Sequence, residues 1–207
     1  MRWRVLIPIK QLDESKSRLT GAAQPPNRHP ELVRALQLDT LAAVARARDL
    51  GTVIAGIYLV TDQPPEQLPF ELTVLSDPGG GLNAALAHAA REIDAEHQKD
   101  GVAAMVADLP ALRPDELLAA LTTAQQFDRA FVPDLVGSGT TMLTVGPGRA
   151  LQPRFGPDSA ALHRASGASE LVAGNSLRCD VDTAADLQRC LQLGLGAHTA
   201  RMVAHFV

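Results

Sequence analysis

Short apolar segments alternate with helical segments along most of the chain, and this alternation limits the possible folds more than any other feature of the sequence. The expected strands are Trp3–Ile9, Thr52–Thr61, Glu71–Leu75, Gly101–Ala107, Arg129–Pro133 and Thr141–Val145. The expected helices are Pro30 to about Arg48, Leu82 to about His97, a segment that begins at Pro114, Asp158–Ala165 and Thr183–Leu193. Strands that alternate with helices form βαβ units and a mainly parallel sheet. The sequence therefore predicts an α/β protein with a three-layer α/β/α arrangement, and ligands are expected at the carboxyl ends of the strands.

Composition narrows the classes of partner. The chain has 207 residues, of which 46% are hydrophobic, so a single domain over residues 1–207 is expected. With a net charge of −4, the chain has no global basic field to hold nucleic acid or an anionic membrane. The apolar runs are shorter than the roughly 20 residues of a transmembrane helix, and Trp3–Ile9 is interpreted as a strand rather than a signal peptide. We expect a cytoplasmic protein in which Cys179 and Cys190 are reduced, with no nucleic acid or membrane partner.

Several motifs of nucleotide-binding and hydrolytic enzymes are absent from the sequence. There is no G-x-x-x-x-G-K-[ST] motif, no G-x-G-x-x-G motif after the first strand, and no G-x-S-x-G motif. The six histidines lack the spacing of a metal site, and each is interpreted as a surface or packing residue. P-loop hydrolases, dinucleotide-binding enzymes and serine hydrolases are therefore disfavoured.

A cluster of cationic side chains follows the first expected strand. Two of the three lysines in the chain, Lys10 and Lys16, lie in this loop together with Arg18. Fixed cations at the carboxyl edge of a sheet suit a triphosphate, whose charge must be neutralised before a nucleophile approaches. We expect Lys10, Lys16 and Arg18 to hold nucleotide phosphates, and the alternative is an ordinary solvated loop.

Two acidic segments offer ligands for a metal ion. Asp108 follows the most apolar strand, and Asp180 and Asp182 alternate along an extended segment. Because Mg²⁺ prefers one or two carboxylates together with substrate oxygens, Asp108 and Asp180 are predicted to bind Mg²⁺, as one ion or two. The alternatives are that Asp108 caps a helix near Pro110 and that Asp182 is the N-cap of the next helix.

A run of glycines precedes the helix expected from Leu82. Gly79, Gly80 and Gly81, followed by Asn83, allow the backbone to approach a base, a ribose or an anionic group. We expect this loop to bind a nucleotide, and the alternative is a flexible turn.

Two further loops offer donors that add little bulk. Thr140 carries a hydroxyl, Gly156 allows close approach of the backbone, and Ser159 lies in the first turn of an expected helix, where free N–H groups favour an anion. These three residues are predicted to bind a substrate phosphate. Asp158 is expected to cap this helix or to touch metal-bound water, and the alternative is that Ser159 is itself the cap.

Taken in order, these segments resemble the 2-phospho-L-lactate guanylyltransferase family, including its actinobacterial phosphoenolpyruvate guanylyltransferase members. The resemblance covers nearly the whole chain, and it is carried by Ile7–Lys10, Lys16–Leu19, Leu32–Leu36, Leu38–Ala43, Asp77–Asn83, Ala107–Leu112, Phe131–Asp134, Gly139–Thr141, Arg154–Ser159 and Asp180–Thr183. One departure is Cys179, which stands where the resemblance leads us to expect a basic residue.

The resemblance implies a MobA-like nucleotidyltransferase, with the fold of the nucleotide-diphospho-sugar transferases, that acts in coenzyme F(420) biosynthesis. The implied reaction joins GTP to a three-carbon phospho-acid, either phosphoenolpyruvate or 2-phospho-L-lactate, and releases pyrophosphate. Lys16, Arg18 and Asp108 are then the candidate catalytic residues, and Mg²⁺ is the expected cofactor.

Two other functions are compatible with this fold. One is another MobA-like transferase, such as a molybdopterin cytidylyl- or guanylyltransferase, and the other is a catalytically inactive nucleotide-binding subunit. The presence of Asp108 and of the lysine loop argues against the inactive subunit. Phosphoenolpyruvate is favoured as the acceptor because the composition looks actinobacterial. The product is expected to be unstable, which makes the downstream transferase a possible partner, and the oligomeric state is open.

Overall fold

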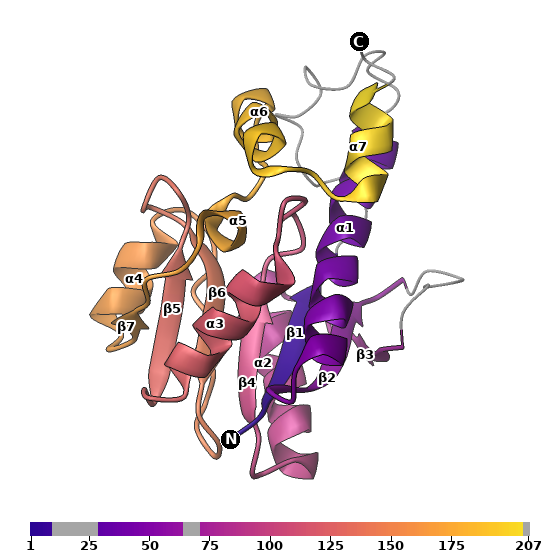
Figure 1. Ribbon diagram of the computed structural model, residues 1–207. Helices are drawn as coiled ribbons and strands as arrows, with labels where there is room; N and C mark the ends of the chain where they lie inside the picture. The colour runs from indigo at the N-terminus through magenta and orange to yellow at the C-terminus, as the bar shows by residue number, and fades with distance from the viewer. Residues whose placement is uncertain (10–28, 64–70, 205–207) are drawn as a thin grey trace.

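The computed structural model describes residues 1–9, 29–63 and 71–204, and these form one sheet covered by helices on both faces (Figure 1). The strand order is β3-β2-β1-β4-β6-β5-β7. The strands are β1 (Trp3–Pro8), β2 (Ile54–Thr61), β3 (Thr73–Ser76), β4 (Gly101–Met105), β5 (Arg129–Pro133), β6 (Thr140–Val145) and β7 (Ser169–Glu170). Only β6 runs antiparallel to its neighbours among these strands, so the expected mainly parallel sheet is confirmed.

The helices divide between the two faces because alternate residues of each strand point to opposite sides. Trp3, Val5 and Ile7 of β1 pack in one core with α1 (His29–Leu50) and α3 (Pro114–Ala124). Leu6 belongs to the core of the other face, which is covered by α2 (Leu82–Glu96) and α4 (Ser159–Ala165). In Figure 1, α1 and α3 lie in front of the sheet and α2 lies behind it. The expected three-layer arrangement is therefore confirmed.

Three short helices lie beyond the carboxyl ends of the parallel strands: α5 (Asn175–Arg178), α6 (Ala184–Leu193) and α7 (Ala197–Ala204). Figure 1 shows α6 and α7 above the sheet. They contribute to a third apolar core with the first half of α1, and the buried members of this core are Leu32, Leu36, Ala111, Cys179, Val181, Leu187 and Cys190. The sequence pattern did not indicate α5, α7 or the two-residue strand β7.

Most element boundaries differ from the expected ones by one or two residues. The strand β4 ends at Met105 rather than Ala107, and the next backbone N–H, that of Val106, donates to Thr141 at the start of β6. The helix expected over Thr183–Leu193 begins at Ala184 because Thr183 is its N-cap. None of the helices described here is long and apolar enough to span a bilayer.

The order of the strands indicates where a ligand belongs. From β1 the chain moves outward to β2 and β3, then returns to β4 on the opposite side of β1. Loops that leave the carboxyl ends of β1 and β4 therefore diverge, and open α/β sheets bind ligands in the crevice at such a point. The loop after β4 carries Asp108, and the loop after β1 carries Lys10, Lys16 and Arg18, which lie outside the described residues.

The indole of Trp3 fixes the amino end of the sheet. Its Nε1–H donates to the Leu121 carbonyl at 2.8 Å, and a Cβ on Gly101 would lie 2.4 Å from the ring. We expect Gly101→Ala to lower the free energy of unfolding by about 1–3 kcal/mol, because the ring and the adjacent strand must move apart.

Urea unfolding followed by the fluorescence of Trp3, the single tryptophan, measures this change. Gly146→Ala is the matched control, since its Cβ would meet only the Asp128 carbonyl at an ordinary 3.6 Å. Equal unfolding midpoints for the two variants would show that the ring does not constrain residue 101.

Candidate active site

Two acidic segments that are far apart in the sequence meet at the carboxyl edge of the sheet. The Val181 N–H donates to the Asp108 carbonyl at 3.1 Å, which places Asp180 and Asp182 on either side of this contact. The hydrogen bond with Cys179 and burial raise the pKa of the Cys190 thiol, and the negative charges of Asp180 and Asp108 raise it further. The backbone of the Asp180–Asp182 segment therefore lies against the Asp108 turn.

The loop that carries Asp108 is held by a hydroxyl from α1. Thr40 Oγ1 accepts from the Leu109 N–H at 2.9 Å, and its single proton can be donated to the Leu36 carbonyl of its own helix at 2.9 Å or to the Ala107 carbonyl at 3.1 Å. The Ala107 carbonyl and the Leu109 N–H lie on either side of Asp108 in the chain. One buried threonine therefore stabilises the turn that carries this carboxylate. Oδ1 of Asp108 is itself buried. The alternative role of Asp108 as a helix cap is wrong for α3, whose N-cap is Arg113.

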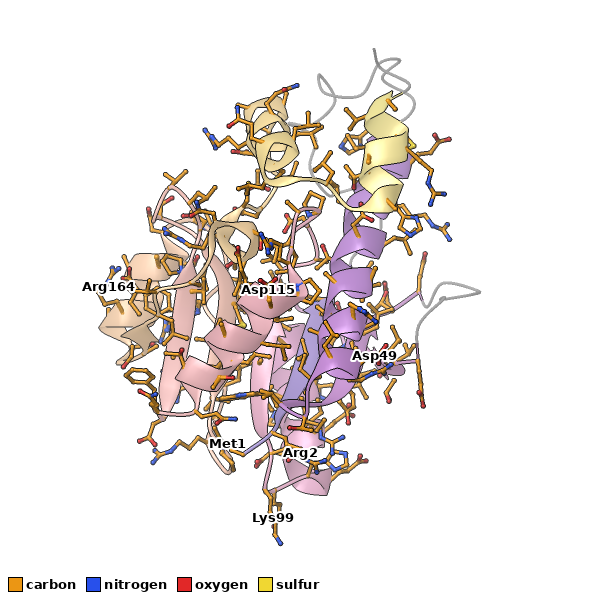
Figure 2. All side chains as sticks on the ribbon, in the orientation of Figure 1. Met1, Arg2, Asp49, Lys99, Asp115 and Arg164 are labelled. Atoms are coloured by element: carbon orange, nitrogen blue, oxygen red, sulfur yellow. The ribbon has the colours of Figure 1, made fainter. Side chains whose placement is uncertain are left out.

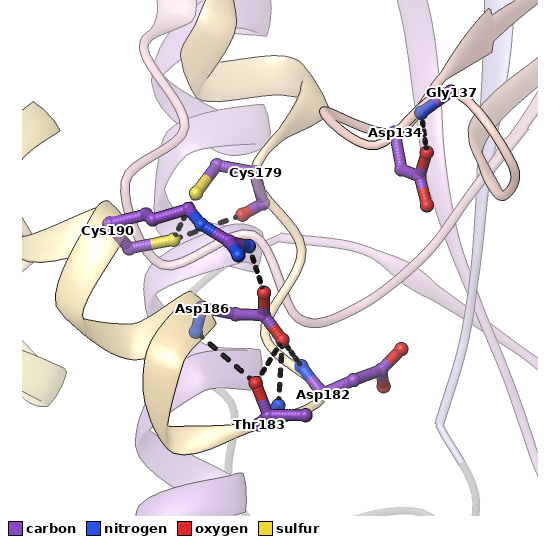
Figure 3. Close-up of polar contacts among 8 residues, drawn as sticks. Asp134, Gly137, Cys179, Asp182, Thr183, Asp186 and Cys190 are labelled. Atoms are coloured by element: carbon purple, nitrogen blue, oxygen red, sulfur yellow. Dashed lines mark hydrogen bonds and ion pairs between the residues drawn. The ribbon is translucent and has the colours of Figure 1, made fainter.

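Asp182 is not a helix cap either. The N-cap of α6 is Thr183, whose hydroxyl accepts from the Asp186 N–H at 3.3 Å, while the Asp186 carboxylate accepts from the Thr183 N–H at 2.8 Å. Figure 3 shows this reciprocal capping box, with the Asp182 carboxylate pointing away from it. The alternative role that the sequence left open for Asp182 is therefore filled by its neighbour.

Cys179, which stands where the resemblance predicts a basic residue, is buried in the third apolar core. It is 2% exposed and its Sγ lies 2.7 Å from Sγ of Cys190, and both are free thiols (Figure 3). The pair belongs to the third apolar core, between α1 and α6. The departure from the expected basic residue thus adds packing beneath the Asp180–Asp182 segment instead of a cation beside it.

The glycine run before α2 adopts a backbone that side chains disfavour. The φ angles of Gly79, Gly80 and Gly81 are 84°, 83° and 91°, and Gly79 and Gly80 are exposed. The Asp77 carboxylate accepts from the Gly79 N–H at 2.8 Å and so stabilises the turn. Three successive residues with positive φ require glycine, which explains the run without a need for flexibility.

Asn83 joins this loop to the loop that precedes α4. Its Oδ1 accepts from the Phe155 N–H at 2.8 Å, and its Nδ2 donates to the Phe155 carbonyl at 2.9 Å. The side chain therefore has a structural role that sequence reasoning missed, and its direct contact with a nucleotide stays a prediction. Because Phe155 precedes Gly156, Asn83 places the glycine loop beside a residue predicted to bind the acceptor.

Thr140 is 6% exposed and is bonded to a histidine. Its Oγ1 lies 2.9 Å from Nδ1 of His163, whose Nε2 accepts from the Arg154 N–H at 2.9 Å. Burial lowers the pKa of His163 to about 4, with contributions from the positive charges of Arg129 and Arg154. The sequence predicts only a surface or packing role for each histidine, and no local spacing indicates this contact.

The start of α4 differs from expectation in its capping. Asp158 is at the N-cap with φ 54°, but its side chain makes no cap hydrogen bond, so the expected capping role is wrong. Ser159 is the first helical residue and not the cap; it is 2% exposed, and its N–H donates to the Gly156 carbonyl at 3.2 Å. Gly156 has φ 132°, is exposed, and has open space where a Cβ would lie.

These groups share one edge of the sheet. The Val106 N–H donates to the Thr141 carbonyl at 3.0 Å, and this bond joins the end of β4, two residues before Asp108, to the start of β6 beside Thr140. Lys99, the only lysine in the described part of the chain, lies at the other end of the molecule near Arg2 and Met1 (Figure 2). It is therefore remote from the carboxyl edge.

Comparison with known proteins assigns the family. The family model described as "Guanylyl transferase CofC like" matches residues 3–205. The chain belongs to this family. A phosphoenolpyruvate guanylyltransferase of Streptomyces coelicolor is 47% identical, with 100% of this chain and 98% of that protein covered. One of Geodermatophilus obscurus is 43% identical over 97% of this chain and 94% of that protein.

Solved structures confirm the fold of this CofC-like chain. A protein of Desulfovibrio desulfuricans, named as a putative nucleotide-diphospho-sugar transferase, superposes with a TM-score of 0.70 and 18% identity, covering 99% of this chain and 95% of that one. A 4-diphosphocytidyl-2C-methyl-D-erythritol synthase gives a TM-score of 0.53 at 12% identity over 93% and 98%. The nucleotide-diphospho-sugar transferase fold implied by the sequence is therefore confirmed.

The hydroxyl of Thr40 should affect the rate of guanylyl transfer, because it holds the turn that carries Asp108. Thr40→Val removes the hydroxyl that flanks Asp108 and leaves the buried Leu109 N–H without its acceptor. We expect kcat to fall about tenfold and the Mg²⁺ concentration for half-maximal activity to rise, because the Asp108 turn relaxes. Thr40→Ser, which keeps the hydroxyl, should stay close to wild type.

Steady-state rates measured over a Mg²⁺ titration test this expectation. Thr122→Val on α3 is the control, because that hydroxyl is exposed and bonds only the Leu118 carbonyl of its own helix. Wild-type kcat and Mg²⁺ dependence in Thr40→Val would show that Asp108 is positioned without the hydroxyl.

Proposed function

We propose that this chain is a phosphoenolpyruvate guanylyltransferase that acts in coenzyme F(420) biosynthesis. The observation that carries the proposal is the hydrogen bond that joins the Asp180–Asp182 segment to the Asp108 turn at the carboxyl edge, in a chain whose full-length relatives are named for this activity. A phosphate oxygen of phosphoenolpyruvate attacks the α-phosphorus of GTP. The bond from the α-phosphorus to the oxygen that bridges it to the β-phosphorus breaks, and that oxygen leaves with its electron pair as pyrophosphate.

The residues present fit Mg²⁺ as the cofactor. The carboxylates of Asp108 and Asp180 are hard oxygen ligands. A pair of carboxylates completed by phosphate oxygens and water suits Mg²⁺ better than a site made of protein groups alone. When bound, Mg²⁺ neutralises charge on the nucleotide phosphates.

In this proposal the remaining charge on the phosphates is met by the loop after β1. Lys10, Lys16 and Arg18 hold the triphosphate, and Lys16 and Arg18 stabilise the charge that develops as pyrophosphate leaves. The Gly79–Gly81 turn, of which Gly79 and Gly80 are exposed, faces the guanosine, where the lack of side chains permits close approach.

The acceptor is assigned to Thr140, Gly156 and Ser159. The proposal is supported by the hydrogen bonds of His163 to Thr140 and to the Arg154 N–H, which lies in the loop of Gly156. Ser159 is the first residue of α4, the helix that carries His163. The attacking phosphate is already ionised near neutral pH, so no general base is needed. The protein's task is to bring two polyanions together, and positioning together with neutral or cationic donors accomplishes it.

Pyrophosphate release from GTP, Mg²⁺ and each phospho-acid tests the proposal. We expect turnover with phosphoenolpyruvate, a lower kcat/KM with 2-phospho-L-lactate, and little reaction when CTP replaces GTP. Asp108→Asn should lower kcat by about a hundredfold or more, because a ligand of the metal loses its charge.

Asp115→Asn is the matched control, since this carboxylate is exposed in the first turn of α3 and its side chain pairs with Arg113. Preferred use of 2-phospho-L-lactate would change the assigned acceptor. Wild-type turnover of Asp108→Asn at saturating Mg²⁺ would contradict the role of the acidic pair.

A further inference from the structure

His163 is the one buried imidazole that contacts both loops assigned to the acceptor, within the described part of the chain. It lies one turn into α4 and has no exposed surface. Its ring is 5.9 Å from the ring of Phe131 and 5.4 Å from that of Phe155, measured between centroids. The aromatic contacts satisfy the ring faces, whereas both ring nitrogens are used for hydrogen bonds.

The partners of the two nitrogens assign the tautomer. The Arg154 backbone N–H can only donate, so Nε2 of His163 accepts. In a neutral imidazole the proton is then on Nδ1, which donates to Oγ1 of Thr140 at 2.9 Å. The ring stays neutral because burial and the charges of Arg129 and Arg154 oppose protonation and lower its pKa.

This direction of hydrogen bonding determines what Thr140 can offer to a ligand. An oxygen that accepts from Nδ1–H keeps its own O–H proton as a donor for another group. An anionic phospho-acid accepts hydrogen bonds, so Thr140 is oriented in the sense that an acceptor anion requires. A phenylalanine at position 163 would fill the same space between Phe131 and Phe155 but would leave the hydroxyl without this orientation.

The same imidazole also fixes the backbone next to Gly156. Arg154 is held by His163, and Phe155 is held at both its N–H and its carbonyl by Asn83. The Arg154–Phe155 segment is thus bonded on one side to α4 and on the other to the helix that follows the glycine loop. Its position is set by side chains that need not touch either substrate.

We propose that His163 is a positioning residue for the phospho-acid, acting through Thr140, whose hydroxyl it orients as a donor. This inference rests on the proposed function, because it assumes that the acceptor lies against Thr140. It predicts an effect on the KM for phosphoenolpyruvate and not on the KM for GTP, whose predicted contacts are in other loops.

Two substitutions separate the hydrogen bonds of the ring. The side-chain amide of asparagine reaches about as far as Nδ1 and can still donate to Thr140, whereas the longer glutamine reaches the position of Nε2 and can accept from Arg154. We expect His163→Gln to raise the KM for phosphoenolpyruvate about tenfold or more and to change the KM for GTP less than twofold. His163→Asn should recover most of the loss.

A double-mutant cycle with Thr140→Val tests whether the effect passes through Thr140. The His163→Gln penalty should largely disappear in the Thr140→Val background, because the hydroxyl to be oriented is absent. His88→Gln, at a half-buried histidine of α2 that pairs with Glu92, is the control and should leave both KM values unchanged. Melting temperatures of all variants report on the fold.

The outcomes distinguish a failure of the proposed function from a failure of the role of His163. No turnover of GTP and phosphoenolpyruvate by the wild-type protein would overturn the proposed function and this inference with it. With wild-type turnover established, an unchanged KM for phosphoenolpyruvate in His163→Gln would overturn the inference alone. A second pattern would also overturn the inference: both KM values rise equally, and the melting temperature falls, in His163→Gln and in His163→Asn. A purely structural role of His163 predicts that pattern.

Discussion

A single backbone hydrogen bond, from the Val181 N–H to the Asp108 carbonyl, brings together the two acidic segments on which the proposed chemistry depends. Asp108 leaves the centre of the sheet, whereas Val181 lies between α5 and α6, beyond the last strand. Val181 and Cys179 share the small apolar core above the sheet with Leu32 and Leu36 of α1. This packing supports the position of the Asp180–Asp182 segment over the Asp108 turn.

Helix α1 contributes to this edge through two adjacent polar residues. Thr40 holds the Asp108 turn, and Asp39 accepts from the His198 and Thr199 N–H groups at 2.9 and 2.7 Å, which anchors the first turn of α7. A Cβ on Gly196 would lie 2.3 Å from Cγ of Asp39, so the chain passes α1 at a distance that only glycine permits. The sequence Asp39-Thr40 therefore connects the acidic site to the helices that cover it, and a change at either position should affect both.

Local pattern was sufficient to predict the layers of the fold but not the contacts that organise the site. The short apolar runs of β1 and β4 reflect burial on both faces of these strands, which the sequence records residue by residue. In contrast, α7 depends on a carboxylate about 160 positions away, and the roles of Asn83 and His163 depend on partners in other elements. The segments of Asp108 and Asp180 are joined by a backbone hydrogen bond, and the role of the two carboxylates as metal ligands stays a prediction. Asp158 is at the N-cap of α4, but its backbone is left-handed and its side chain makes no cap hydrogen bond.

The central claim is that Asp108 and Asp180 hold Mg²⁺ with the nucleotide while the phospho-acid lies against Thr140 and Gly156. A crystal structure of the protein with Mg²⁺, the α,β-methylene analogue of GTP and phosphoenolpyruvate tests it most directly. The account predicts Mg²⁺ at about 2.0–2.1 Å from an oxygen of each carboxylate and the acceptor phosphate within hydrogen-bond distance of the Thr140 hydroxyl. Mg²⁺ bound without Asp108 and Asp180, or an acceptor phosphate remote from Thr140, would contradict it.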